Sequence, residues 1–105
     1  MGAFAERLAR ELELEPATAA ALAENFLRAT RDDLRKLQAA VLAGDARLVA
    51  ALAHHVKGAA ANLEVESIRS RCESLERQAR TGDLARAGEL LSGIGAEVRR
   101  LEAGP

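Results

Sequence analysis

The two histidines of this chain, His54 and His55, are neighbours in the segment Ala-His-His-Val-Lys-Gly. An imidazole has an unperturbed pKa of about 6.5, so near neutral pH it can serve as a nucleophile, a proton carrier or a metal ligand. Lys57 stands one helical turn after His54, and Gly58 follows it. Because a glycine inside a helix costs about 1 kcal/mol relative to alanine, Gly58 predicts the close approach of another molecule beside the imidazole.

The spacing of apolar residues predicts that this segment is a helix. Apolar residues recur at spacings of three and four residues and form one stripe, which we expect to be buried: Leu48, Leu52, Val56, Ala59 and Leu63. His54 lies roughly 200° around the helix from Leu52 and from Val56, so it is expected to point to solvent. His55 flanks the stripe and is expected to pack at the helix edge. A metal site is not expected, because side chains at adjacent helical positions diverge.

The pattern His54-x-Val56-Lys57-Gly58, with Ala53 before it and Asn62-Leu63 after it, resembles the signature of the histidine-containing phosphotransfer (HPt) domains. These domains are relay modules of multistep two-component signalling. The resemblance implies that His54 carries a phosphoryl group on its outer ring nitrogen, taken from a receiver aspartate or a histidine kinase and passed to a receiver aspartate. It implies a stoichiometric carrier rather than a turnover enzyme. Where the family usually has a glycine, this chain has Glu64, so the backbone of that connection stays open.

Three further side chains are candidates for the site. Lys57 can place its ammonium group against phosphoryl oxygens. If the helices on either side of residues 64–65 are antiparallel, Glu76 lies level with His54. Its carboxylate can then accept the proton of the inner ring nitrogen and so fix the tautomer. Some members of the family have Glu at the matching position, and Arg80 matches a polar or basic position near the docking surface. Lys57 could instead be an ordinary surface lysine, and Glu76 and Arg80 a surface ion pair worth about 0.3 to 0.5 kcal/mol.

The expected docking surface surrounds His54 and consists of small residues: Ala50, Ala51, Gly58 and Ala61. The resemblance implies receiver domains as partners, with a histidine kinase as a further candidate. It also places the magnesium ion with the receiver's aspartates, so we expect no metal or cofactor on this chain. One alternative is a catalytically silent helical adaptor or inhibitor of a kinase or receiver. Another is a helical bundle for dimerisation, which leaves the outward His-Gly face unexplained.

Composition fits one helical domain over residues 1–105. The chain is 49% hydrophobic and 30% charged, whereas only 2% is aromatic, which favours closely packed helices over strands. A net charge of -1 gives no support for nucleic-acid binding. No apolar run approaches the roughly 20 residues that span a bilayer. We therefore expect a cytoplasmic protein that binds neither membrane nor nucleic acid. The pattern leaves the oligomeric state open, and we favour a monomer. Cys72 is expected to be a buried, inert thiol.

Helix signals divide the chain further. Pro16 suits a first helical turn, Gly44 and Gly82 suit helix ends, and Asp45 and Asp83 suit the N-caps that follow. The short connections favour an antiparallel up-down four-helix bundle with a short N-terminal cap helix. The expected helices are approximately 3–12, 16–43, 46–63, 66–81 and 84–102.

Overall fold

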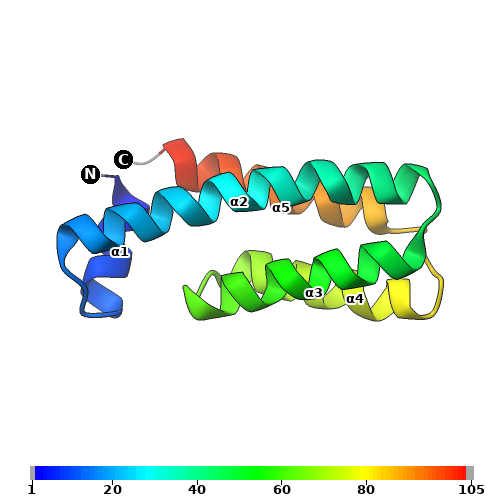
Figure 1. The fold of residues 1–105 in the computed structure, drawn as a ribbon, viewed down its shortest axis with the longest axis horizontal. Coiled ribbons are helices and arrows are strands. Elements are labelled where there is room, and N and C mark those ends of the chain that lie inside the picture. Colours follow the sequence, from blue (N-terminus) through cyan, green and yellow to red (C-terminus); the bar gives the residue numbers. More distant parts are fainter. Residues whose placement is uncertain (1, 104–105) are drawn as a thin grey trace.

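The computed structural model describes residues 2–103, and these residues form five helices without a strand (Figure 1). The helices are α1 (Ala3–Glu11), α2 (Pro16–Leu42), α3 (Ala46–Asn62), α4 (Glu66–Arg80) and α5 (Ala87–Ala103). The predicted all-α class is therefore confirmed.

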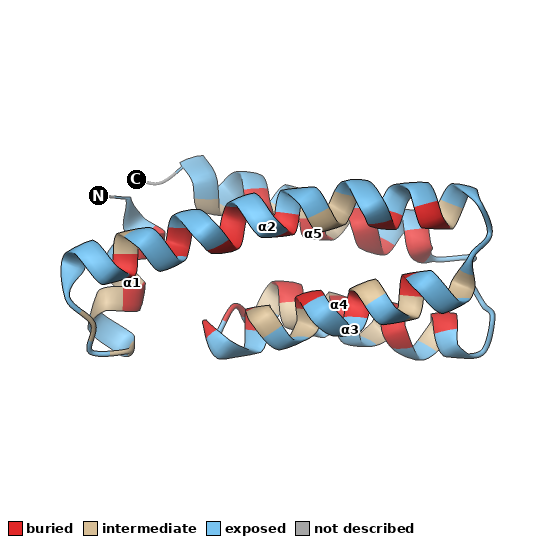
Figure 2. Ribbon diagram, in the orientation of Figure 1, coloured by how far each residue is buried: buried red, intermediate tan, exposed pale blue. Residues whose placement is uncertain are grey.

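The four long helices form an antiparallel bundle, and α1 covers one end of it (Figure 1). Helices α2 and α5 form one pair, and α3 and α4 form the other. Helix α1 packs against α2 and α5, so that Phe4 and Leu8 are buried and the ring of Phe4 meets that of Phe26 edge-on. The buried residues face the space between the pairs (Figure 2).

Two helix starts follow the sequence signals. Pro16 is the first residue of α2, where its missing N–H breaks no helical hydrogen bond. The Asp45 carboxylate accepts a hydrogen bond from the Leu48 amide at 3.1 Å, which caps α3. The start of α5 was predicted wrongly: it begins at Ala87, because Asp83 accepts from the Ala85 amide and forms a local turn instead of a helix cap.

Glutamate occupies a position that usually favours glycine after two of the helices. Gly44 and Gly82 have φ of 68° and 79°, as expected for the residue that reverses the chain after a helix. Glu13 and Glu64 adopt the same left-handed conformation, with φ of 54° and 56°. The connection between α3 and α4 therefore keeps its glycine-like backbone although it has no glycine, and it carries the strain of a side chain there.

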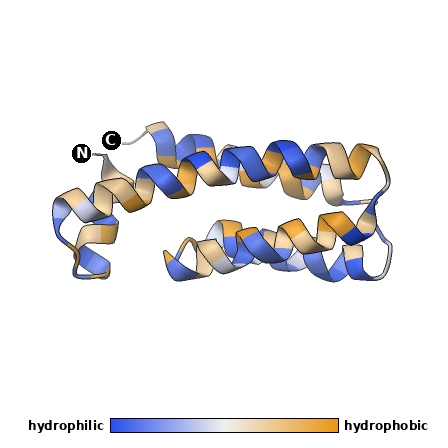
Figure 3. Cartoon of the chain, in the orientation of Figure 1, coloured by the Kyte–Doolittle hydropathy of each residue, from blue (hydrophilic) through white to orange (hydrophobic). Residues whose placement is uncertain are grey.

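The buried stripe of α3 was predicted correctly at Val56 and Leu63 but one position too early at Leu48, Leu52 and Ala59. Its members in the structure are Val49, Ala53, Val56 and Ala60, continued by Leu63. Leu48 is exposed, and hydrophobic residues extend over much of α3 while α4 is mainly hydrophilic (Figure 3). Because α3 is apolar on most sides, its periodicity does not decide which stripe is buried; packing against α2 and α4 does.

Candidate functional site

The two histidines leave α3 on opposite sides of its outward face. With the buried stripe of α3 as the reference, a rotation of about 100° per residue turns His54 towards α4 and His55 towards α2. Both imidazoles are largely exposed, with 64% of the His54 side chain and 70% of the His55 side chain accessible. The expectation that His55 packs at the helix edge is therefore wrong.

A buried carboxylate on α4 joins the candidate site residues. The side chain of Glu76 is only 5% exposed, and its Oε2 lies 2.9 Å from Nδ1 of His54. Lys57 forms an ion pair with the other oxygen, Nζ to Oε1, at 2.7 Å. Arg80 reaches Oε2 through Nη2 at 2.5 Å. The structure thus brings His54, Lys57, Glu76 and Arg80 together around one carboxyl group.

The charge on Glu76 decides which tautomer His54 adopts. The Lys57 ammonium group lowers the pKa of Glu76 most, against the opposing effect of burial, and His54 and the charge of Arg80 lower it further. Glu76 is therefore ionised at neutral pH, and an ionised carboxylate only accepts hydrogen bonds. We assign Nδ1 of His54 as the donor. The neutral imidazole then has its unprotonated Nε2 directed away from Glu76, where it can act as a nucleophile.

Small residues separate the two histidines. Ala51 and Gly58 are exposed and lie between them on the outward side of α3. A methyl group built on Gly58 would meet no atom within 4 Å apart from the adjoining residues and backbone of its own helix, so the fold leaves this position free. Ala61 is also exposed on the His54 side, whereas Ala50 is half-buried. The surface beside the imidazole is consequently flat and open.

Asp33 is a site neighbour that the sequence reasoning missed. Its side chain, on α2, is 13% exposed, and its Oδ2 lies 3.6 Å from Nε2 of His55. Counting equal numbers of residues to either side of a helix connection, which pairs His54 with Glu76, also pairs His55 with Asp33. Helices α2 and α3 are antiparallel about Gly44, and Asp33 lies eleven residues before Gly44 while His55 lies eleven after it. Each histidine therefore faces its own carboxylate, His54 through Nδ1 and His55 through Nε2.

The remaining titratable candidate lies inside the bundle. Cys72 is buried, and burial raises the pKa of its thiol to about 12, so this group stays protonated and inert. Within residues 2–103, no group of three or more His, Cys, Asp or Glu side chains could hold a metal ion. No helix in the same part of the chain is both long and apolar enough to cross a bilayer.

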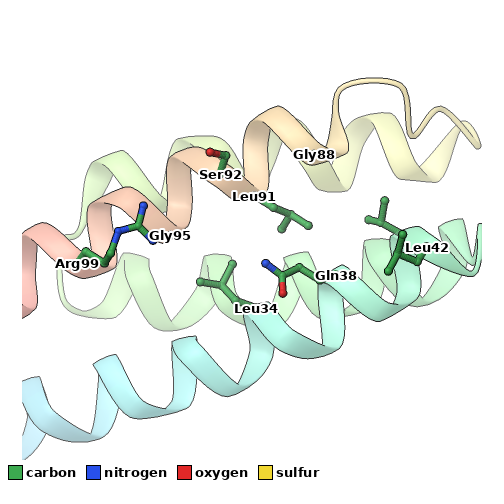
Figure 4. A pocket seen from close by; sticks show the side chains of 9 residues that line it. Leu34, Gln38, Leu42, Gly88, Leu91, Ser92, Gly95 and Arg99 are labelled. Carbon is green, nitrogen blue, oxygen red and sulfur yellow. The ribbon is translucent and has the colours of Figure 1, made fainter.

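Two hollows differ in character. A hollow of about 330 Å³ adjoins the site and is lined by charged residues: Lys57, Glu73, Glu76, Arg77 and Arg80. A larger hollow of about 600 Å³ lies between α2 and α5 (Figure 4), where Leu34, Gln38 and Leu91 form part of the wall. That hollow contains none of the candidate site residues, so size does not indicate where the chemistry is.

Comparison with known proteins agrees with this geometry. The Hpt domain family model matches residues 21–104. The crystal structure of histidine-containing phosphotransfer protein B (HptB) from Pseudomonas aeruginosa PAO1 is similar, with a TM-score of 0.82 and 32% sequence identity. The match covers 90% of this chain and 82% of that one. No curated protein matches the chain significantly.

The fold and the match over most of the chain define a class of protein, the helical phosphotransfer carriers of phosphorelays. The chain belongs to the Hpt domain family. Members of this family interact with receiver domains and kinases.

Proposed function

We propose that Nε2 of His54 is the atom that carries the phosphoryl group. The observation that supports this most is the 2.9 Å contact between Nδ1 of His54 and Oε2 of Glu76, in an imidazole that is 64% exposed. The contact fixes the tautomer, and the exposure leaves Nε2 accessible to a partner. His55 has the opposite arrangement, because its Nε2 faces Asp33.

The proposed step transfers a phosphoryl group from an aspartate side chain of the receiver to the His54 side chain. Nε2 of neutral His54 attacks the phosphorus of a receiver's aspartyl phosphate, the P–N bond forms, and the P–O bond to the receiver's carboxylate breaks. Nδ1 keeps its proton, so the ring of the phosphohistidine carries a positive charge. The Glu76 carboxylate stabilises that charge from 2.9 Å. The reverse step returns the phosphoryl group to an aspartate.

Lys57 is proposed to act on the phosphoryl oxygens. It is one turn from His54, and 28% of its side chain is exposed, so its ammonium group can turn from Glu76 towards an incoming anion. Its charge would offset the negative charge of the transferring group. We propose that the receiver supplies the magnesium ion, and that the chain acts as a stoichiometric carrier rather than as a turnover enzyme.

The proposed partners are receiver domains, with a histidine kinase as a further donor, and the carrier acts as a monomer. The proposed docking surface is the small-residue face around His54, formed by Ala51, Gly58 and Ala61 with Ala50 beside them and Arg80 at its edge. We propose that the chain exchanges phosphoryl groups with these partners in the cytoplasm.

A phosphotransfer assay tests this function. The chain is incubated with radiolabelled phospho-receivers and autophosphorylated kinases from its host, beside His54→Gln and His55→Gln. We expect acid-labile, alkali-stable label on the wild type and on His55→Gln, and none on His54→Gln. If no donor labels the folded wild-type chain, the adaptor function replaces the carrier function.

A further inference from the structure

Two donors share one oxygen of Glu76. His54 Nδ1 lies 2.9 Å from Oε2, and Arg80 Nη2 lies 2.5 Å from the same atom. Lys57 instead contacts Oε1. The guanidinium group and the imidazole therefore draw on the same carboxylate charge, and a stronger bond to one weakens the bond to the other.

The two cations that contact Glu76 differ in how exposed they are to a docking partner. The Arg80 side chain is 65% exposed, whereas that of Lys57 is 28% exposed and that of Glu76 is 5% exposed. A docking molecule can draw Arg80 away from Glu76 without opening the bundle. The partner proposed above presents aspartates around its phosphorylation site, and carboxylates are the ligands that a guanidinium group prefers.

Removing Arg80 from Oε2 would change the nucleophile. A carboxylate that accepts the Nδ1 proton of an imidazole raises the basicity of its other nitrogen, and a cation bound to the same oxygen reduces this effect. The imidazole is thus a weaker nucleophile while Arg80 occupies Oε2. With the guanidinium group moved to another carboxylate, all of the Oε2 charge serves His54.

We propose that Arg80 is a positioning residue that restrains His54 in the free chain and releases it when an acidic receiver docks. The receiver's carboxylate takes the guanidinium group, and Oε2 of Glu76 then interacts with Nδ1 of His54 alone. This inference rests on the proposed function. It makes docking and activation a single event, so that a His54 without a partner reacts slowly.

Two phosphoryl donors separate this role from its alternatives. Phosphoramidate brings no carboxylate; its P–N bond breaks with release of ammonia as the P–N bond to His54 forms. A phospho-receiver brings both the phosphoryl group and the carboxylates. The variants are Arg80→Gln and, as a matched control, Arg77→Gln, because Arg77 lines the same hollow and no carboxylate in residues 2–103 lies within ion-pair distance of it. Both variants remove one positive charge from the exposed face of α4.

We expect Arg80→Gln to change the two reactions in opposite directions. With phosphoramidate it is labelled about threefold faster than Arg77→Gln, because the nucleophile is already released. With a phospho-receiver, the receiver concentration that gives the half-maximal transfer rate rises up to about fivefold, the equivalent of one ion pair. In the free chain, the proton resonance of Nδ1 of His54 moves downfield in Arg80→Gln and not in Arg77→Gln.

Other outcomes overturn the proposal. Slower labelling of Arg80→Gln by both donors would show that Arg80 acts directly on the phosphoryl group. If Arg80→Gln and Arg77→Gln are labelled at equal rates and the Nδ1 proton resonance does not move, Arg80 is a surface charge without influence on His54. The resonance is measured without a donor, so it tests the proposal separately from the proposed function, which fails if the wild type is not labelled at His54.

Discussion

The two adjacent histidines differ in which ring nitrogen their carboxylate holds. Glu76, buried on α4, contacts Nδ1 of His54 at 2.9 Å, while Asp33 on α2 faces Nε2 of His55 at 3.6 Å. The exposure of the two imidazoles is almost the same, at 64% and 70%. Exposure therefore does not distinguish the proposed nucleophile, His54, from its neighbour. The position of the carboxylate that contacts the ring does, because it decides which ring nitrogen is free.

The cations sharpen this difference. Lys57 and Arg80 both reach Glu76, and the hollow beside His54 is lined by charged side chains. Asp33 and His55 form a pair without a comparable cluster of ion pairs among residues 2–103. A phosphoryl group on the α4 side of α3 would thus lie near the charges of Lys57 and Arg80.

Loss of the Glu76 carboxylate should have the largest effect on transfer. In Glu76→Ala the tautomer of His54 is no longer fixed and the positive ring of the phosphohistidine loses its counter-charge. We expect the rate of phosphoryl transfer from a phospho-receiver to fall about 10- to 100-fold, as it does when a carboxylate that orients a histidine ligand of a metal is removed. Stopped-flow or quenched-flow labelling measures this rate. An unchanged rate, with the His54 tautomer also unchanged by ¹⁵N NMR, would show that Glu76 has no role.

A side chain at Gly58 should slow docking without harming the fold. In Gly58→Leu the new side chain enters the open space between the histidines, which is where the proposed docking would place the receiver. A steric cost of about 1 to 2 kcal/mol in the complex lowers the second-order rate constant of phosphoryl transfer roughly 5- to 30-fold. Thermal unfolding should show equal or higher stability, because glycine is a poor helix former. An equal loss of stability and of transfer would instead assign Gly58 a packing role.

Acid should remove the stability that Glu76 contributes. Because the ion pair with Lys57 lowers the pKa of Glu76 below its ordinary value of 4.5, the ionised carboxylate favours the folded chain above pH 4.5. This contribution falls as the pH drops below 4.5 and is lost once the pH passes the lowered pKa of the folded state. Urea unfolding of the wild type and Glu76→Gln at a series of pH values measures it. The gap between their free energies of unfolding should narrow over this range, and a gap independent of pH would contradict the ionised cluster.

A glycine at position 64 should stabilise the fold and leave transfer unchanged. Glu64 has a φ of 56°, a conformation that costs a residue with a side chain about 1 to 2 kcal/mol. Glu64→Gly relieves this strain but loses part of the gain to the greater freedom of glycine in the unfolded chain, so about 1 kcal/mol of added stability is expected. Chemical denaturation measures it, with Glu13→Gly, at φ of 54°, as a matched variant. Lower stability of both variants would show that the glutamates contribute more than their strain costs.

Changes to the second pair should have the smallest effect. Asp33→Ala leaves His55 in solvent, where an ion pair contributes at most about 1 kcal/mol, so the transfer rate should change less than about fivefold. The same assay run on Glu76→Ala provides the scale. Equal losses in the two variants would remove the distinction between the two carboxylates.

Much of the fold was predictable because its signals are local. Proline at a helix start, an aspartate cap and glycine at helix ends are read from single positions, and the all-α class follows from composition. The buried stripe of α3 was not, because a helix apolar on most sides offers two stripes and packing selects between them. The start of α5 was missed because an aspartate can cap a helix or form a turn of its own.

The site divides in the same way. The outward direction of His54 and its level with Glu76 follow from helical geometry and a short connection between α3 and α4. The sharing of Oε2 between His54 and Arg80 does not, because it depends on the rotamers of two side chains. The partner of His55, Asp33, could have been found by counting from Gly44. Which nitrogen of the His55 ring faces Asp33 could not.

The most direct test is to locate the phosphoryl group on the labelled chain. The wild type is phosphorylated by a phospho-receiver and examined by ³¹P and ¹⁵N NMR, with His55→Gln to assign the ring resonances. We predict one phosphoryl group, on Nε2 of His54, with the proton of Nδ1 retained. A phosphoryl group on Nδ1 of His54, or on His55, would contradict the role assigned here to the Glu76 carboxylate.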